Sequence, residues 1–578
     1  MLIDYLEKFR KDLNNILTDK KNLRSHLALL LIWIVLGAIL RFSNLASKLP
    51  WADEWATLVF SLGNSFLTVP LEQVISLETL MQPLQMNETV SVGNVIGNLL
   101  NESTHPPVYF VLTHLWLKLF GTQSGLVSVG LARSLSALFG VVAIPAIFGL
   151  GVVIFGSLIY GQIAAALMAF SPYGVYLAQE TRHYTLAILL VMASLGCLVV
   201  AVRSIGKQQP ISLNIVICWI VINSLGVATH YFFALALVTE ILVLCVCFIQ
   251  DLKKRLFSFK KRSPWRNILL AISGTVAGCS VWVWAWLNIP DNQLTDWTKH
   301  GNPWSSEFLE PIGRIIGWIV TMIMLLPIEG VPVSISVLSV IIVLVTLFFL
   351  LKNTVKYYRE QKISNSETAI KNYVLFAILL IFSFVYIGDR DLTLAARFQF
   401  FYFPGIILTV AAILSYCWQI KGNRAVSKVT IFVLLIAFFG SLSVINNYAY
   451  QKPDRSDLVA PVIREAQQNN PHTPILIATV HKTHEQTGEM MGIAWEWLKQ
   501  TNVDTNPPQF LLLHKQANLP EQNVTKSFHQ QLAKLSRPLD IWVVNFSAPT
   551  GLESQNCRAD LAYKRRVSGY RYRLYHCW

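Results

Sequence analysis

The sequence predicts a polytopic α-helical membrane protein with a soluble α/β domain at its C-terminal end. Three observations favour this class. Of the 578 residues, 53% are hydrophobic and 14% are charged, whereas soluble proteins carry about 25% charged residues. Many apolar residues stand in runs of about 17–25, the length that a helix needs to cross a bilayer. Beyond residue 446, short apolar stretches alternate with polar ones.

Eleven apolar runs are long enough to be membrane spans. They begin near His26, Ser134, Gly156, His183, Ile211, Tyr231, Asn267, Val333, Asn372, Phe400 and Ser427. Two further apolar stretches, 107–120 and 312–327, are harder to assign. The first contains His114 and Lys118 and is short for a span, which is typical of a helix at the membrane interface.

The distribution of Lys and Arg predicts the orientation. Segment 251–266 holds seven basic residues and one acidic residue, and segment 352–371 is also basic, so both are expected on the cytoplasmic side. An even number of spans must then separate them, and stretch 312–327 is expected along the outer face. The chain is predicted to be a multi-pass protein of the plasma (inner) membrane, with segment 1–25 in the cytoplasm and residues 447–578 outside.

The predicted domains are a transmembrane domain, 26–446, and a C-terminal α/β domain, 447–578. The first outer loop, 43–132, belongs to the transmembrane domain and carries interfacial helices. In the C-terminal domain, PILIATV, QFLLLH and DIWVVNF read as strands between helix-compatible stretches. No nucleotide loop or catalytic cluster is evident there, so a structural or acceptor-binding role is predicted. Cys557 and Cys577 could form a disulfide outside the cell.

The net charge of +14 does not predict nucleic-acid binding. The basic residues are clustered between apolar runs, and no RNA- or DNA-binding module accompanies them. This distribution is typical of Lys and Arg on cytoplasmic loops. The expected partners include membrane lipids and no nucleic acid.

Four polar groups are predicted at the outer ends of spans, and their position is informative because ionisable groups are costly at membrane depth. The first is the Asp53-Glu54 pair, in which one carboxylate could be a general base and the other an orienting or metal-binding group. The second is His105, before two prolines, which could donate a hydrogen bond to a phosphate or sugar. A solvated acidic turn and a helix-start histidine are the alternatives. Arg133 opens the second span, where snorkelling alone would explain it.

The third group is AQETRHYTL, with Glu180, Arg182, His183 and Tyr184 beside the membrane, and a solvated loop is the alternative. The fourth is GDRDLTLAARFQFFYFPG, where Arg390 and Arg397 could bind a phosphate head group through their guanidinium groups. An ordinary contact with anionic lipid is the alternative. The predicted topology places all four groups on one face, as expected for an enzyme that acts on a lipid phosphate at the outer leaflet.

A resemblance to a known family is carried by LPWADEWATL, HPPVYFVLTHLWLKLFG, ARSLSALFGVVAIPAIFGLG, SPYGVYLAQETRHYTL and ARFQFFYFPG. These segments resemble the polyprenyl- and dolichyl-phosphate-sugar-dependent glycosyltransferases of the GT-C fold, which include protein O-mannosyltransferases and lipid A aminoarabinose transferases. The resemblance covers residues 26–200 and, more loosely, 388–410 and the segment QKPDRSDLVA. It implies transfer of a sugar from a polyprenyl-phosphate donor to a hydroxyl of a protein, lipid or polysaccharide acceptor outside the membrane, usually with inversion.

The resemblance also implies roles for individual residues. Asp53 matches the acidic residue of the first outer loop and is the expected general base, with Glu54 beside it. His105 matches the histidine of the HPP motif, and Arg133 matches the arginine that opens the second span. Arg397 matches an arginine expected to hold the lipid phosphate.

The second acidic group and the metal are less well defined by the resemblance. Many family members carry the second acid a few positions later, so Glu180 is the nearest candidate here. No cofactor is required, but a divalent cation bound by Asp53, Glu54 and Glu180 stays open because metal dependence varies across the superfamily.

Two other functions are compatible with this sequence. A transporter or flippase of lipid-linked saccharides would also be basic and polytopic, but it should show ionisable residues near mid-span and paired broken helices. A catalytically inactive glycolipid-binding member is the other alternative.

Overall fold

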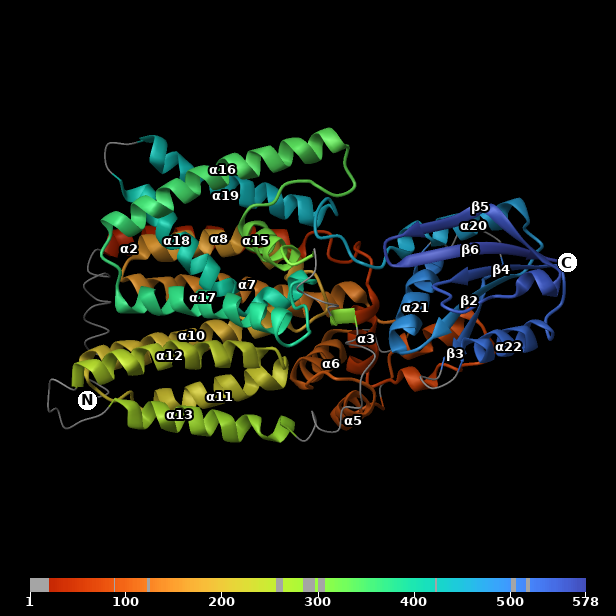
Figure 1. Ribbon diagram of the computed structural model, residues 1–578, viewed down its shortest axis with the longest axis horizontal. Coiled ribbons are helices and arrows are strands. Elements are labelled where there is room, and N and C mark those ends of the chain that lie inside the picture. Colours follow the sequence, from red (N-terminus) through yellow and green to blue (C-terminus); the bar gives the residue numbers. More distant parts are fainter. Residues whose placement is uncertain are drawn as a thin grey trace. The chain divides into compact units, whose positions relative to one another are not determined.

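A computed structural model describes residues 20–87, 89–121, 125–255, 264–283, 297–299, 307–420, 424–499, 506–515 and 520–578. The chain forms two compact units (Figure 1). The first consists of the described residues of Met1–Leu45, Arg133–Pro290 and Trp297–Gln451. The second contains those of Ala46–Ala132 and Lys452–Trp578, so the first outer loop and the C-terminal segment pack together.

The first unit is a bundle whose long helices lie side by side along one direction (Figure 1). Its elements are α2 (Lys20–Phe42), α7 (Val129–Phe155), α8 (Leu158–Phe170), α9 (Pro172–Ala178), α10 (Tyr184–Lys207), α11 (Leu213–Thr229), α12 (Phe233–Arg255), α13 (Trp265–Cys279), α15 (Glu310–Ile323), α16 (Val333–Glu360), α17 (Asn365–Tyr386), η4 (Ala396–Phe401), α18 (Phe403–Gln419) and α19 (Arg424–Ile445).

These helices confirm the predicted polytopic class. Within the described residues, eight are long and apolar enough to cross a membrane, or nine if the bent pair α8–α9 is one span. The predicted spans beginning near Ile211 and Phe400 correspond to α11 and α18, which have 17 residues each. Stretch 312–327 corresponds to α15, with 14 residues.

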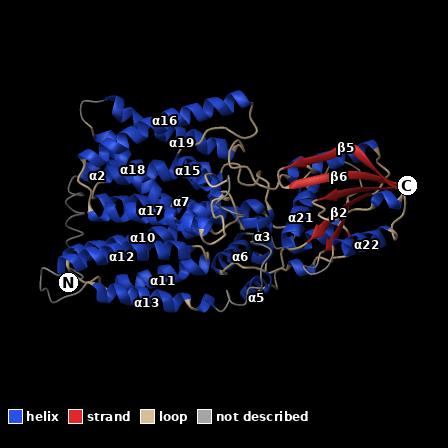
Figure 2. Cartoon of the chain, viewed as in Figure 1, coloured by secondary structure: helices blue, strands red, loops and turns tan. Residues whose placement is uncertain are grey.

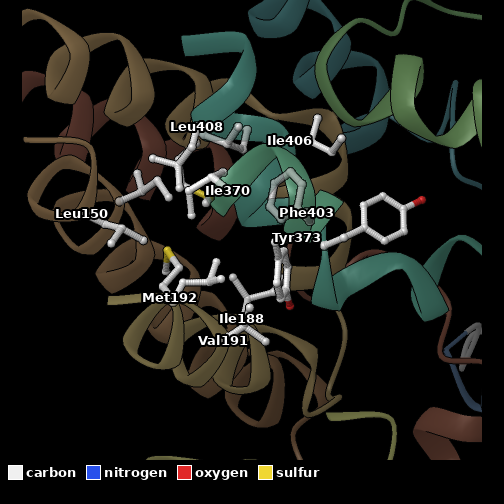
Figure 3. Packing of buried hydrophobic residues seen from close by; sticks show 14 of the residues in the cluster. Leu150, Ile188, Val191, Met192, Ile370, Tyr373, Phe403, Ile406 and Leu408 are labelled. Atoms are coloured by element: carbon white, nitrogen blue, oxygen red, sulfur yellow. The ribbon is translucent and has the colours of Figure 1, made fainter. Parts of the chain in front are cut away.

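Helix α16 illustrates how a sequence selects a lipid-facing helix. Its buried side includes Ser339, Thr346 and Asn353, which recur every seven residues, whereas its exposed positions are mainly Val, Ile, Leu and Phe. Small polar residues allow close contact between helices, and apolar side chains are suited to lipid. Elsewhere the bundle has an apolar core, in which Leu150 of α7, Met192 of α10 and Tyr373 of α17 lie close together (Figure 3).

Helices α8 and α9 follow each other with a sharp bend between them. The two helices meet at Ser171 and Pro172 with a bend of 55°. Pro172 cannot continue the hydrogen-bonding pattern of α8, but it is well suited to the first turn of α9. Ser171 caps α9, because its hydroxyl accepts from the Gly174 amide at 3.0 Å and donates to the Met322 carbonyl at 2.7 Å.

The break leaves the last carbonyls of α8 without helical donors. Arg41, fully buried at the end of α2, donates to the carbonyls of Met168 at 2.7 Å and Ala169 at 3.0 Å. The hydroxyl of Ser441 on α19 donates to the Phe170 carbonyl at 2.7 Å. Three successive carbonyls at the break are thus satisfied by side chains from two other helices.

The second unit contains a six-stranded sheet in the order β1-β3-β2-β4-β6-β5. Its strands are red in Figure 2. The strands are β1 (Val74–Ile75), β2 (Ile475–His481), β3 (Gln509–His514), β4 (Leu539–Val544), β5 (Cys557–Val567) and β6 (Tyr570–Cys577). The helices are α3 (Ala52–Ser61), α4 (Leu77–Met81), α5 (Val92–Glu102), α6 (Val108–Phe120), α20 (Ala460–Asn469), α21 (His484–Leu498) and α22 (Glu521–Leu532).

The central strands confirm the predicted α/β domain. β2 is parallel to β3 and β4, and successive residues of β2 enter two different cores. Ile475 and Ile477 pack with α3 and α21 on one face, whereas Leu476, Ala478 and Val480 pack with α22 on the other. Coverage of both faces explains why these strands are continuous apolar runs.

The edges of the sheet come from segments that the strand prediction did not include. β1, from the first outer loop, pairs antiparallel with β3. β5 and β6 form an antiparallel hairpin at the end of the chain. Cys557 and Cys577 are register partners in this hairpin and form a disulfide.

Candidate functional site

The ten predicted site residues are divided between the two units. Asp53, Glu54 and His105 belong to the second unit, and the others belong to the first. Their exposure separates them into two classes. Four are half-buried, namely Asp53, His105, Arg390 and Arg397. Six are buried, namely Glu54, Arg133, Glu180, Arg182, His183 and Tyr184.

Asp53 and Glu54 lie in the first turn of α3. The helix dipole stabilises negative charge at this position. The N-cap residue, Trp51, makes no side-chain cap, but Asp454 accepts a hydrogen bond from the Ala52 amide at 2.9 Å. The segment QKPDRSDLVA, which carries part of the family resemblance, thus caps the helix that bears Asp53.

His484, the first residue of α21, is an unexpected neighbour of Asp53. Its ring stacks on Phe66 with centroids 5.0 Å apart and meets Phe60 edge-on. Burial lowers the pKa of His484 to about 4, although the Asp53 carboxylate acts in the opposite direction. Burial thus favours the neutral form of His484 beside Asp53.

His105 lies just before α6, beside a residue of the core that covers one face of the sheet. Its Nδ1 is 3.0 Å from the Ser103 hydroxyl, and its ring contacts Phe110. The residue as a whole is half-buried. α6 itself exposes Leu115, Leu119 and Phe120, an apolar side of the kind that the interfacial prediction requires.

The turn between α9 and α10 is buried, which excludes the solvated-loop interpretation of this segment. Glu180 and His183 have no exposed surface, and Arg182 is 2% exposed. The Arg182 amide donates to the Glu180 carbonyl at 2.8 Å, which closes the turn. The Gln179 side chain ties the turn to α2 by donating to the Ser43 carbonyl at 2.8 Å.

The start of α7 holds the same turn from another side. The Ser136 hydroxyl donates to the Arg182 carbonyl at 2.9 Å, and Thr185 donates to the Ser136 carbonyl at 3.0 Å. Arg133, one turn earlier, is fully buried and donates to the Leu45 carbonyl at 2.9 Å. Arg133 is therefore bound to backbone within the protein, and snorkelling does not describe it.

Two arginines of the fourth group keep accessible surface. Arg390 donates to the Thr298 hydroxyl at 3.2 Å. The Arg397 guanidinium lies 5.3 Å from the ring centre of Trp297 and 5.2 Å from that of Phe398, within the range of a cation–π contact. The two rings stack on each other with centroids 5.7 Å apart, so Arg397 lies beside the stacked pair. A guanidinium beside aromatic rings can bind an anion while the rings contact an apolar chain.

A buried ion pair fixes the loop that carries both arginines. Asp391 has no exposed surface, and its carboxylate accepts from Arg314 Nη2 at 2.5 Å. Thr393 bridges the two, because its amide and hydroxyl donate to Asp391 while the hydroxyl accepts from Arg314 Nε at 2.9 Å. Neither Asp391 nor Arg314 was among the predicted site residues, because their pairing across the chain has no local sequence signal.

The structure brings the third and fourth groups together within the first unit. The Tyr173 hydroxyl on α9 donates to the Ala396 carbonyl of η4 at 3.0 Å. The Phe400 ring of η4 lies 4.9 Å from His230 and 6.0 Å from Tyr184. His230 in turn meets His183 edge-on at 4.2 Å. η4, which carries Arg397, therefore packs against the buried turn.

A carboxylate also lies inside the bundle, where the sequence analysis placed none. Glu240 of α12 is 3% exposed and accepts from the Ser194 hydroxyl at 2.9 Å and from Trp219 at 3.3 Å. Ser194 also contacts Asn223 at 2.8 Å, and Asn223 donates to Thr275 at 3.3 Å. This polar network joins α10, α11, α12 and α13. The sequence feature that could have indicated it is the single charged residue, Glu240, within the apolar stretch VTEILVL.

The sequence left open whether Asp53, Glu54 and Glu180 bind a divalent cation. Among the residues that the structure describes, no group of three or more His, Cys, Asp or Glu side chains is arranged to hold a metal ion. Glu180 belongs to the first unit, whereas Asp53 and Glu54 belong to the second.

Comparisons with known proteins give a likeness in structure alone. No family model and no curated protein matches the chain. ArnT from Cupriavidus metallidurans in the apo state is similar, with 11% sequence identity, a TM-score of 0.47, and coverage of 97% of this chain and 98% of that chain. The same protein bound to undecaprenyl phosphate has 12% sequence identity and a TM-score of 0.48, with coverage of 96% of this chain and 98% of that chain. A third similar structure is the archaeal oligosaccharyltransferase AglB from Archaeoglobus fulgidus, in complex with an inhibitory peptide and a dolichol-phosphate. It has 13% sequence identity and a TM-score of 0.43, with coverage of 95% of this chain and 74% of that chain.

Proposed function

We propose that the protein is an integral-membrane glycosyltransferase that moves a sugar from a polyprenyl-phosphate donor to an acceptor hydroxyl on the extracytoplasmic side of a plasma (inner) membrane. The observation that supports this most is the surrounding of Arg397. Arg397 is half-buried, its guanidinium lies against two aromatic rings, and it belongs to a bundle of apolar helices. A lipid phosphate needs both a cation for its head group and apolar surface for its chain.

The reaction follows from the residue types. A sugar phosphate is already activated, because the bond from the anomeric carbon to the phosphate oxygen breaks with an anionic leaving group. Asp53 takes the proton of the acceptor hydroxyl as that oxygen bonds to the anomeric carbon. Arg390 and Arg397 stabilise the charge that develops on the departing polyprenyl phosphate. Glu54 and His105 orient the acceptor and donor, and an inverting displacement needs no covalent nucleophile.

Two observations favour the transporter instead. Glu240 is a buried carboxylate within a span, and α8–α9 is a broken helix, two features expected of transporters. Glu240 nevertheless has its hydrogen-bond donors within the bundle, and the described residues contain one bent helix pair rather than a matched set. The enzyme is therefore the better-supported function.

The test is release of free polyprenyl phosphate from a panel of polyprenyl-phosphate sugars by the purified protein, with membrane extract as the source of acceptor. The wild-type protein should release it from at least one donor, and Asp53→Asn should not. Glu78→Gln is a matched control, because it neutralises an exposed carboxylate in the first turn of α4. If no donor reacts and the protein instead moves lipid-linked saccharide across liposomes, the transporter is the correct function.

A further inference from the structure

The hairpin formed by β5 and β6 carries positive charge that its own residues do not balance. The two strands hold six Lys or Arg residues and one acidic residue, Asp560. Asp560 is used within the hairpin, because it accepts from the Ala562 amide at 2.8 Å and lies 3.4 Å from His576 Nε2. Five of the basic residues are exposed and form no ion pair within the described part of the chain. They are Arg558, Lys564, Arg565, Arg566 and Arg571.

Three arginines lie on one side of the hairpin, close to its turn. Arg566 and Arg571 are register partners, so their side chains leave the same side of the sheet with Cβ atoms about 5 Å apart. Arg573 follows Arg571 by two residues and shares that side. Its Nη1 donates to the Tyr575 hydroxyl at 3.0 Å, and its guanidinium lies 5.3 Å from that ring centre. We call Arg566, Arg571 and Arg573 the arginine face.

The stability of the hairpin does not explain the arginine face. Like charges directly opposite each other destabilise a sheet, and the neighbouring acidic groups are bonded elsewhere. Asp454, beside the hairpin turn, accepts from the Ala52 amide at 2.9 Å. Glu489 accepts from the Asn545 side chain at 2.7 Å. The repulsion between the arginines is therefore unrelieved within the described residues, and an anion from outside would relieve it.

The composition of this surface favours a polar anion over a bilayer. Between Lys564 and Arg573, every residue is described and no large apolar side chain is exposed. Surfaces that bind membranes place such side chains beside their cations. Helix α6 has that composition, with Leu115, Leu119 and Phe120 exposed. The hairpin and α6 are thus suited to different partners.

The geometry of the hairpin favours a chain with several negative groups that binds through its side groups. A guanidinium binds one carboxylate by two parallel hydrogen bonds, so three neighbouring guanidiniums can hold several carboxylates. β5 is the edge strand of the sheet, where an extended peptide could add. Its ladder is irregular between Asp560 and Arg565, which disfavours such pairing. The disulfide between Cys557 and Cys577 joins the two strands at the end away from the turn, so the register of the arginines is fixed.

We propose that the arginine face is a binding surface for an acidic polysaccharide whose sugars carry carboxylates. Such a polymer supplies both the repeated negative charge that the arginines require and free hydroxyl groups. The inference rests on the proposed function for the role of the polymer, which is then the acceptor among the protein, lipid and polysaccharide classes. Binding itself requires no transfer of sugar, so it can be measured separately.

The experiment measures binding of alginate oligosaccharides, which are polyuronates, to the purified full chain in nanodiscs of zwitterionic lipid. Neutral dextran and polyglutamate are the comparison ligands. Wild-type protein should bind alginate, more weakly as salt rises, and should bind neither dextran nor, with equal affinity, polyglutamate. Arg571→Gln should weaken alginate binding about tenfold, because it removes a charge-assisted hydrogen-bond donor.

Two further variants separate binding from folding. Arg558→Gln is the matched control, because Arg558 is exposed on the same hairpin and pairs with His576, about 17 Å along β6 from Arg571. Exposed charges at this distance are screened, so alginate binding should stay within about twofold of wild type. Arg571→Glu should abolish alginate binding while its unfolding midpoint is equal to or higher than that of wild type, because an opposite charge then faces Arg566.

The outcomes distinguish this inference from the proposed function. Loss of alginate binding by Arg571→Gln, with binding by Arg558→Gln retained, supports the inference. Absence of wild-type binding, or unchanged binding by Arg571→Gln, refutes it, and the release of polyprenyl phosphate by wild type and Asp53→Asn is then unaffected. Equal affinity for polyglutamate, or binding of phosphatidylglycerol vesicles in place of alginate, also refutes it, in favour of an acidic peptide or a membrane surface. If alginate binds through Arg571 but no donor reacts in its presence, the binding surface stands and the proposed function fails.

Discussion

Replacement of Arg41 by methionine tests whether side chains from other helices stabilise the break between α8 and α9. The fully buried guanidinium donates to the carbonyls of Met168 and Ala169, which the break deprives of helical donors. Methionine fills similar space but donates no hydrogen bond. Each buried carbonyl left without a donor costs about 1–3 kcal/mol, so the two cost about 2–6 kcal/mol. Removal of a buried charge offsets part of this cost, and a net loss of about 2–4 kcal/mol is expected.

The assay is unfolding in mixed micelles, followed by the loss of helical circular dichroism as denaturing detergent is added. Arg24→Met is the matched control, because Arg24 is exposed on the same helix, and it should change the unfolding free energy by less than about 0.5 kcal/mol. The unfolding free energy of Arg41→Lys should lie between those of Arg41→Met and Arg24→Met. Lysine keeps the positive charge, but it lacks the planar guanidinium whose two nitrogens donate to two carbonyls at once. Equal stability of Arg41→Met and Arg24→Met would refute this account of the break.

Three further predictions concern other parts of the chain. Burial lowers the pKa of both His481 and His484 to about 4, against about 6.5 in an unfolded chain. Their stabilising contribution is therefore complete above about pH 6.5 and is lost as pH falls towards 4, and the double variant His481→Gln/His484→Gln should show a flatter dependence of thermal stability on pH in this interval. Reduction of the Cys557–Cys577 disulfide, which joins residues 20 apart in sequence, should destabilise the second unit by about 3 kcal/mol, and an unchanged unfolding midpoint under reducing conditions would contradict this. Glu240→Gln should keep the network with Ser194 and Trp219 and unfold within about 1 kcal/mol of wild type. Glu240→Ala removes the acceptor that Ser194 and Trp219 share and leaves a cavity between the helices, so it should lose about 2 kcal/mol or more. Equal stability of the two variants would show that the network is dispensable.

The fold class could be predicted because it depends on local patterns. Run length identifies a helix that crosses a membrane, and continuous short apolar runs identify buried strands. The break at Ser171-Pro172 was not predicted, since the apolar run continues through it and the compensating donors, such as Arg41, lie far away in sequence. β1 was missed for a similar reason, because two residues paired with β3 carry no detectable strand pattern.

The candidate site was only partly predictable. Residue types suggested Asp53 and Arg397, but exposure depends on tertiary packing, and burial of Glu180 and Arg182 could not be inferred from a polar, charged segment. His484 approaches Asp53 only because α21 packs on α3.

The central claim is that Asp53 acts in the chemical step, as the general base, while Arg397 binds the phosphate of the donor. The most direct test measures, for each variant, both the rate of polyprenyl phosphate release and the dissociation constant for undecaprenyl phosphate. Asp53→Asn should lose a factor of about 10²–10⁴ in rate and keep its dissociation constant within about twofold. Arg397→Ala should weaken binding by about tenfold or more. Near-normal release by Asp53→Asn, or unchanged binding by Arg397→Ala, would contradict the assigned roles.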